Sequence, residues 1–320
     1  MRKLMISEIM RKFVVDGNVR KFIISDINGF PNLYYSVMNY LDSISQTDDV
    51  ELYINGNLVG MDSENLPETQ LLYDLQRRMN SGNKKFKIIY LAGNHEIELY
   101  KRLLESGQEK FTKPITDFLG ELPIYHRFEE TINSKRIVLA NAACPFVATA
   151  KCNIFVKDIN SGDKQLVSEI MKCTNTKHFT QYDHIGNRNY FSIVGHNPNN
   201  DPKGYEYNPD GDYLNIDGGS DPFQKGFAYY NHFPLVELKV AETKNEEVED
   251  DNGKRELRVV AKSFKFKILT FNSKNKIVLG HYFYGGRSIP LSDGEIREEN
   301  KRLKVGKQMI RDEYPNKKLR

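Results

Sequence analysis

The sequence has 320 residues, of which 39% are apolar, so it can form one large domain or two small ones with a sizeable core. Its formal net charge is +3, and its three cysteines include no C-x-x-C pair, which argues against a disulfide framework or a zinc ribbon. No apolar run approaches the roughly 20 residues of a spanning helix, and Glu8, Arg11 and Lys12 interrupt any signal peptide. We expect a cytoplasmic protein without a membrane span, acting in its own cell or in a host cell if exported.

The charge is concentrated at the two ends of the chain. Residues 1–24 carry six Lys or Arg against two acids, and residues 287–320 carry ten against six. Basic ends can contact membrane or nucleic acid, but neither end interleaves aromatic residues with its charges. Solvated ends are therefore the favoured interpretation, and nucleic acid is not expected as a partner.

The first part of the chain alternates strand and helix patterns. Short apolar runs that end in turn residues predict buried strands over 21–25, 51–55, 86–92, 136–140 and 191–195. Helical patterns over 31–44 and 67–81 lie between the first three strands, each with a proline near its start. This order predicts a parallel α/β arrangement, in which ligands bind beyond the carboxyl ends of the strands.

The later part of the chain has a different pattern. The sequence is helical through 97–122, and beyond residue 205 it predicts antiparallel strands over 212–217, 233–240, 257–271 and 276–284. The acidic stretch EEVEDDNGK (246–254) predicts a solvated hairpin tip. From about residue 292 the spacing is helical with weak amphipathicity.

Five turns follow the five buried strands, and together they carry a resemblance. They are SDIN (25–28), NGNLVGMD (55–62), GNHE (93–96), NAACP (141–145) and GHNP (195–198). In order and spacing they resemble the calcineurin-like metallophosphoesterases, especially the branch of the Ser/Thr phosphoprotein phosphatases. The resemblance runs from about residue 21 to 284 and includes LNIDGGS (214–220).

The resemblance implies a fold class and a domain organisation. It implies an α/β protein with a four-layer αββα sandwich of mixed sheets flanked by helices. We expect an N-terminal extension over 1–20, the phosphoesterase-like domain over 21–290, and a charged helical tail over 291–320.

The resemblance also implies a two-metal site, in which divalent ions activate a bridging hydroxide that attacks phosphorus. Carried over by position, Asp26, Asn94 and His196 are retained metal ligands. Three ligand positions are altered, because asparagine stands where the family has histidine or aspartate: Asn28, Asn57 (the bridging position) and Asn141. His95 is the retained general acid, but Gly60 replaces the aspartate that orients it, and Met61 replaces the arginine that holds the phosphate.

These substitutions weaken metal binding in physical terms. An amide oxygen is a weaker ligand than imidazole for Mn, Fe or Zn, and a neutral amide cannot offset the repulsion between two adjacent cations. No bound cofactor is therefore expected, and an active protein would use a divalent metal of the Mn, Fe or Zn type. One metal held by the retained ligands and waters is the alternative.

Each of these residues also has a structural interpretation. Asp26 is as well suited to cap the helix near Pro31 as to bind metal. His95 and His196 can be hydrogen-bonded structural residues. Asp62 and Asp217 are substitute acids or, more simply, turn residues, and Cys144 is a small apolar side chain near Asn141.

Two functions follow from different classes. The leading hypothesis is a pseudophosphatase, a degenerate phosphatase-like protein that binds a protein or phosphorylated ligand without hydrolysis. The alternative is an active metal-dependent Ser/Thr or Tyr phosphatase or phosphoesterase with an atypical or single-metal site. The sequence does not identify the partner.

Overall fold

The computed structural model of the chain describes residues 19–60, 66–106, 109–132, 135–142, 154–175, 190–196, 201, 203–208, 213–218, 232–249, 255–272, 274, 276–284 and 287–313. The first elements alternate as the sequence predicts: β1 (Val19–Ile24), α2 (Pro31–Ile44), β2 (Asp49–Asn55), α3 (Leu66–Met79) and β3 (Phe86–Leu91). Helix α2 has the predicted bounds, and Pro31 takes the first helical position, where its missing N–H costs no hydrogen bond.

The first sheet has seven strands in the order β12-β11-β10-β9-β1-β2-β3. Strands β1, β2 and β3 pair in parallel, so their carboxyl ends lie at one edge. The remaining pairs are antiparallel. The added strands are β9 (His232–Glu249), β10 (Arg255–Asn272), β11 (Ile277–Tyr284) and β12 (Arg287–Pro290).

The second sheet has five strands in the order β4-β5-β6-β8-β7 and is also mixed. Its strands are β4 (Tyr125–Ile132), β5 (Lys135–Ala140), β6 (Tyr190–Val194), β7 (Glu206–Asn208) and β8 (Tyr213–Asn215). Strands β5 and β6 pair in parallel and are the predicted strands at 136–140 and 191–195. The predicted strand at 212–217 was expected to be antiparallel, but β8 pairs with β6 in parallel and with β7 antiparallel.

A core between the two sheets explains why the predicted strands are apolar on both faces. Ile23 faces the second sheet with Leu139 and Ile193, whereas its neighbours Phe22 and Ile24 pack into the helix-side core. Across the interface, Phe191 of β6 stacks on Phe266 of β10 with ring centroids 5.5 Å apart. Burial on both faces is typical of parallel strands covered on both sides.

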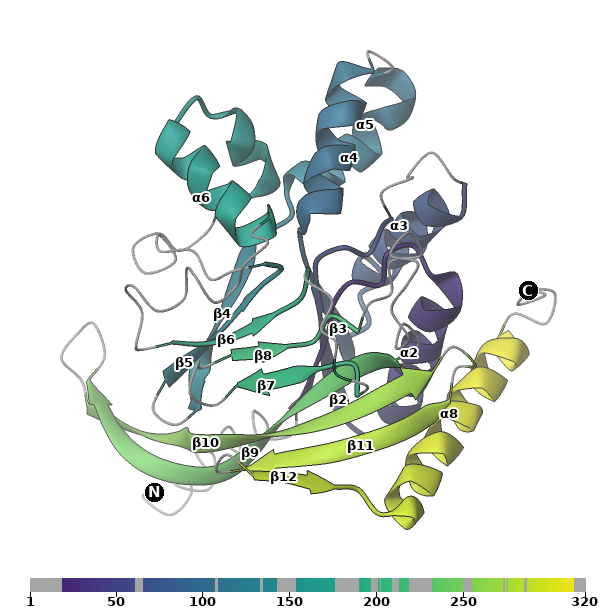
Figure 1. Ribbon diagram of the computed structural model, residues 1–320, viewed down its shortest axis with the longest axis vertical. Coiled ribbons are helices and arrows are strands. Elements are labelled where there is room, and N and C mark those ends of the chain that lie inside the picture. Colours follow the sequence, from purple (N-terminus) through teal and green to yellow (C-terminus); the bar gives the residue numbers. More distant parts are fainter. Residues whose placement is uncertain are drawn as a thin grey trace, which may run out of the picture.

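Helices flank the sheets, which confirms the α/β sandwich predicted from the sequence. Figure 1 shows α2, α3 and α8 (Asp293–Glu313) on one side of the seven-stranded sheet, and the other helices at the top of the view. Those at the top are α4 (Asn94–Glu105), α5 (Glu109–Gly120) and α6 (Lys164–Asn175), with the short 3₁₀ helix η2 (Val156–Asn160). The predicted helical stretch 97–122 is thus two helices, the first beginning at Asn94. Among the described helices, none is both long and apolar enough to cross a bilayer.

The helical segment expected after residue 292 is α8, and it packs against the body of the protein. Leu303 is buried, and the Gly306 backbone lies so close to α2 that a Cβ there would be 1.7 Å from the Asn39 carbonyl oxygen. Glu299 of α8 forms a buried ion pair with Lys267 of β10 and accepts a 2.7 Å hydrogen bond from Tyr40 of α2. The expected domain boundaries at 20 and 290 stay predictions.

The acidic stretch 246–254 differs in part from its prediction. Strand β9 continues to Glu249 and β10 resumes at Arg255, with Glu249 opposite Arg255 in the register. The first four residues of the acidic stretch, 246–249, are therefore strand. Residues 250–254 lie outside the described residues.

Candidate site at the carboxyl ends of the strands

The turns after five strands bring the sequence-predicted site residues together. Asp26 and Asn28 follow β1, Asn57 follows β2, and Asn94 and His95 follow β3 and begin α4. From the second sheet, Asn141 follows β5 and His196 follows β6. We call these seven residues the strand-end cluster: Asp26, Asn28, Asn57, Asn94, His95, Asn141 and His196.

Four residues of the cluster have a left-handed backbone conformation. The φ angles are 52° at Asp26, 50° at Asn28, 51° at Asn57 and 66° at His196. Asp, Asn and His tolerate positive φ better than most residues with a side chain. The tight turns are joined to one another, since the Asn28 N–H donates to the Asn57 carbonyl at 2.7 Å and the Asp26 N–H donates to the Gly56 carbonyl at 3.2 Å.

Asp26 is a buried carboxylate whose two oxygens both accept hydrogen bonds. Oδ1 accepts from Asn57 Nδ2 at 2.8 Å, and Oδ2 accepts from the His196 N–H at 2.9 Å and from the Ser25 hydroxyl. Burial raises the pKa of Asp26 from 3.8 to about 6, while these hydrogen bonds act in the opposite direction.

The capping role considered for Asp26 is wrong. The N-cap of α2 is Phe30, which makes no side-chain capping bond. The carboxylate of Asp26 bonds instead to the turns after β2 and β6.

Asn57 is the centre of the hydrogen bonds in the cluster. Its Oδ1 accepts the His95 N–H at 3.2 Å, and its Nδ2 donates to Asp26 Oδ1 at 2.8 Å and to Asn94 Oδ1 at 3.0 Å. Asn94 Oδ1 also accepts from His196 Nδ1 at 3.0 Å. The three retained ligand residues named from the sequence therefore do meet, with the Asn57 amide between two of them.

His95 is held by a backbone carbonyl. Its Nδ1 lies 2.8 Å from the Val59 carbonyl oxygen, which can only accept, so Nδ1 carries the proton and Nε2 is the acceptor of the neutral ring. Gly60, the next residue, is buried and stands where the family has the orienting aspartate. The chain therefore orients this ring with a neutral group.

Asn141 packs beside Asn57 around a glycine. A Cβ at Gly93 would lie 2.1 Å from Asn57 Oδ1 and 2.7 Å from Asn141 Oδ1, so only glycine allows both amides to approach the turn before α4. Asn141 Nδ2 donates to the Asn55 carbonyl at 2.9 Å. Its buried Oδ1 has no hydrogen-bond partner among the described residues.

Glu96 is a positioning residue that sequence reasoning missed. Its fully buried carboxylate accepts the N–H groups of Gly93 at 2.7 Å, Asn57 at 2.8 Å and Val59 at 3.3 Å, which ties the turns after β2 and β3 together. The signal was an acid in the first turn of a helix, where it also favours the helix dipole. Ser25 was missed as well, although it directly precedes Asp26.

Some predicted residues are not part of the described cluster. Met61, Asp62 and Cys144 lie outside the described residues. Asp217 is buried after β8, where its N–H donates to Asn215 Oδ1 at 2.9 Å.

The side chains do not fit the two-metal centre that the family resemblance implies. Both oxygens of Asp26 accept hydrogen bonds, and Asn57 directs an amino group rather than an oxygen at Asp26 and Asn94. Among the described residues, no three His, Cys, Asp or Glu side chains are placed to hold a metal ion together. Asp26 instead accepts hydrogen bonds from Asn57, His196 and Ser25, and the Asn57 amide links it to Asn94.

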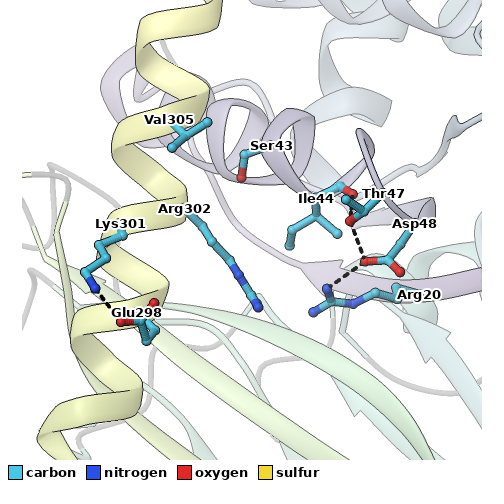
Figure 2. Close-up of a pocket in the computed structure, with 9 residues that line it drawn as sticks. All are labelled: Arg20, Ser43, Ile44, Thr47, Asp48, Glu298, Lys301, Arg302 and Val305. Carbon is cyan, nitrogen blue, oxygen red and sulfur yellow. Dashed lines mark hydrogen bonds and ion pairs between the residues drawn. The ribbon is translucent and has the colours of Figure 1, made fainter.

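A separate groove of about 320 Å³ lies between the end of α2 and helix α8. Figure 2 shows its charged side chains, which form ion pairs with each other or with neighbours: Arg20 with Asp48, and Lys301 with Glu298. Arg302 pairs with Glu299 at 3.1 Å. Each of these pairs lies on one side of the groove, the first beside β1 and β2 and the other two within α8.

The chain has distant likenesses among solved structures. No protein-family model and no curated protein matches the sequence. The chain is similar to the structure of a protein proposed to be a diadenosine tetraphosphatase, with TM-score 0.36 and 15% identity over 77% of this chain and 100% of the other. It is also similar to a structure proposed to be a 5'-nucleotidase from Staphylococcus aureus in complex with α-ketoglutarate, with TM-score 0.32 and 12% identity over 90% of this chain and 58% of the other. Both are too distant to carry an argument about this chain.

Proposed function

We propose that this protein is a pseudophosphatase, which binds a protein or phosphorylated ligand at the strand-end cluster without hydrolysing it. The observation that carries the proposal is the set of mutual hydrogen bonds among side chains at the ligand positions, above all those from Asn57 to Asp26 and Asn94. Groups that bond to one another in this way are not directed at a metal pair.

The chemistry of the cluster supports binding rather than hydrolysis. Hydrolysis in the family that the sequence resembles needs two cations to deprotonate water and to stabilise the attacked phosphorus. The amides of Asn28, Asn57 and Asn141 are neutral and cannot take a proton from water. The ring of His95 is held by the neutral Val59 carbonyl, whereas the family orients this ring with an aspartate.

The exposed edge of the cluster gives a ligand somewhere to bind. Asp26, Asn57 and Asn141 are at most 2% exposed, whereas Asn94 and His196 are partly exposed. The amino group of the partly exposed Asn94 side chain can donate to phosphate oxygens and to peptide carbonyls, so a ligand with such acceptors matches this edge. The partner would be a protein or phosphoprotein, and the binding would need no cofactor.

The test measures metal content and turnover on the same samples. The purified protein and its Asp26→Ala variant are incubated with excess Mn²⁺, desalted and analysed for metal by mass spectrometry. Both are then assayed on an aryl phosphate and a phosphoserine peptide. We expect no stoichiometric metal and no turnover above the variant, with retention of the peptide as a bound ligand.

A gain-of-function variant tests the same proposal from the opposite direction, by restoring the residues of the family. Restoring the family residues by Asn28→His, Asn57→Asp and Asn141→His should create metal binding in the inert parent. Turnover by the wild type that is lost in Asp26→Ala, His95→Ala and His196→Ala would overturn the proposal in favour of an active single-metal phosphoesterase.

A further inference from the structure

We infer that the Asn57 side chain replaces the metal as the cross-link of the strand ends, so that the native state is closed by an amide and its stability is independent of divalent cations. The inference concerns the architecture of the site and does not depend on whether a ligand is hydrolysed. It follows from the disagreement between the implied metal pair and the side chains present.

The orientation of the amide is fixed by a neighbouring backbone group. The His95 N–H lies 3.2 Å from one terminal atom of Asn57, and a backbone N–H can only donate, so that atom is the oxygen. The other terminal atom is therefore the amino group, which faces Asp26 Oδ1 and Asn94 Oδ1. Both protons of the amino group meet an acceptor. In the reversed orientation the amino group would face the His95 N–H, and the oxygen would face the oxygens of Asp26 and Asn94.

This amide joins three turns of the first sheet directly, and its partners connect them to the second sheet. Its own turn follows β2, Asp26 follows β1, and Asn94 and His95 begin α4 after β3. The chain of contacts continues to His196 after β6 in the second sheet, through Asp26 Oδ2 and Asn94 Oδ1. One neutral side chain thus holds together the region where several strands end.

A carboxylate at position 57 would need a cation. Its second oxygen would lie near the present Nδ2, 2.8 Å from Asp26 Oδ1 and 3.0 Å from Asn94 Oδ1, so acceptors would face acceptors. In this buried environment two unscreened carboxylates repel strongly, and the repulsion is relieved by a proton or by a bound metal. Asparagine has nearly the same shape and closes the cluster without either.

The experiment compares thermal unfolding in chelator and in excess Mn²⁺. We expect the wild type to have the same Tm in both, whereas Asn57→Asp should have a Tm lower by about 5 °C in chelator and regain it in Mn²⁺. Asn80→Asp is the matched control, since Asn80 is exposed beyond the end of α3, and its Tm should not respond to Mn²⁺.

Two results would overturn the inference: a wild-type Tm that falls in chelator, or an Asn57→Asp protein as stable as the wild type in chelator. If Asn57→Asp does not fold, Asn57→Ala removes both donors without adding a charge. It should then lower the Tm in chelator and in Mn²⁺ alike, and an unchanged Tm would also count against the inference. The outcomes are distinguishable from the proposed function, because phosphate release by a metal-independent fold would refute only the latter.

Discussion

Replacing Glu96 by glutamine should destabilise the fold more than any comparable surface change. The Glu96 carboxylate is fully buried and accepts the N–H groups of Gly93, Asn57 and Val59 at 2.7, 2.8 and 3.3 Å. Glutamine keeps one oxygen, which can serve the two shorter contacts as a neutral acceptor. Its amino group must then face the Val59 N–H, which is also a donor.

The magnitude follows from these three contacts. Hydrogen bonds to a charged acceptor contribute about 1.5–3 kcal/mol each, and neutral ones contribute about 1 kcal/mol. Weakening two bonds and leaving one buried donor unsatisfied gives a loss of about 3–5 kcal/mol in the free energy of unfolding. The first turn of α4 also loses a favourable charge, which adds up to about 1 kcal/mol.

Equilibrium unfolding in urea at neutral pH measures this loss, with Glu98→Gln as the matched control. Glu98 lies on the same helix, its side chain is 51% exposed, and its carboxylate is 4.0 Å from Arg102 Nε. An exposed pair of this kind contributes less than about 1 kcal/mol. If the two variants have the same free energy of unfolding, the role assigned to Glu96 in joining the turns is refuted.

Two further predictions concern the strand-end cluster and the glycine packed against it. Burial raises the pKa of Asp26 from 3.8 to about 6, so the folded protein binds this proton more tightly than the unfolded chain does. The resulting contribution to the free energy of unfolding is fully present below pH 3.8 and is lost as the pH rises through about 6. Urea unfolding should therefore show the wild type losing about 2–3 kcal/mol relative to Asp26→Asn between about pH 4 and pH 7, and a constant difference would contradict it. Gly93→Ala should lower the Tm, since its Cβ would be 2.1 Å from Asn57 Oδ1, with a cost of about 1–3 kcal/mol. The control is Gly294→Ala at the start of α8, where the added Cβ would lie 3.8 Å from Ser292 Oγ. This variant should leave the Tm unchanged or raise it, and an equal loss of Tm in the two variants would count against the packing argument.

Much of the fold could be predicted because its strands are apolar on both faces and its helices begin at recognisable residues. The bounds of α2 follow from local pattern alone, and the first three strands lie where they were predicted, with ends that differ by at most two residues. Strand β4 escaped prediction because its sequence, YHRFEETI, is mostly polar and lacks clear alternation. The parallel pairing of β8 also escaped, since a three-residue strand carries no local information about its partner.

The candidate site was predictable by position but not by bonding. The turn motifs predicted which residues would form the cluster, and the structure places those residues close together. The direction of the Asn57 amide could not be predicted, because it depends on the His95 N–H from a different turn. Glu96 was passed over for a similar reason, since the N–H groups of Asn57 and Val59 that it binds come from a turn distant in the sequence.

The left-handed backbone at four cluster positions limits which residue types fit there without strain. At positions 26, 28, 57 and 196 a branched or bulky side chain would be strained, whatever its chemistry. The residues that tolerate this conformation best are glycine, aspartate, histidine and asparagine. Asparagine is the one of these that keeps a side chain with both a donor and an acceptor while carrying neither charge nor imidazole. Asparagine at positions 28 and 57 therefore meets the requirement of the turn while it adds no charge.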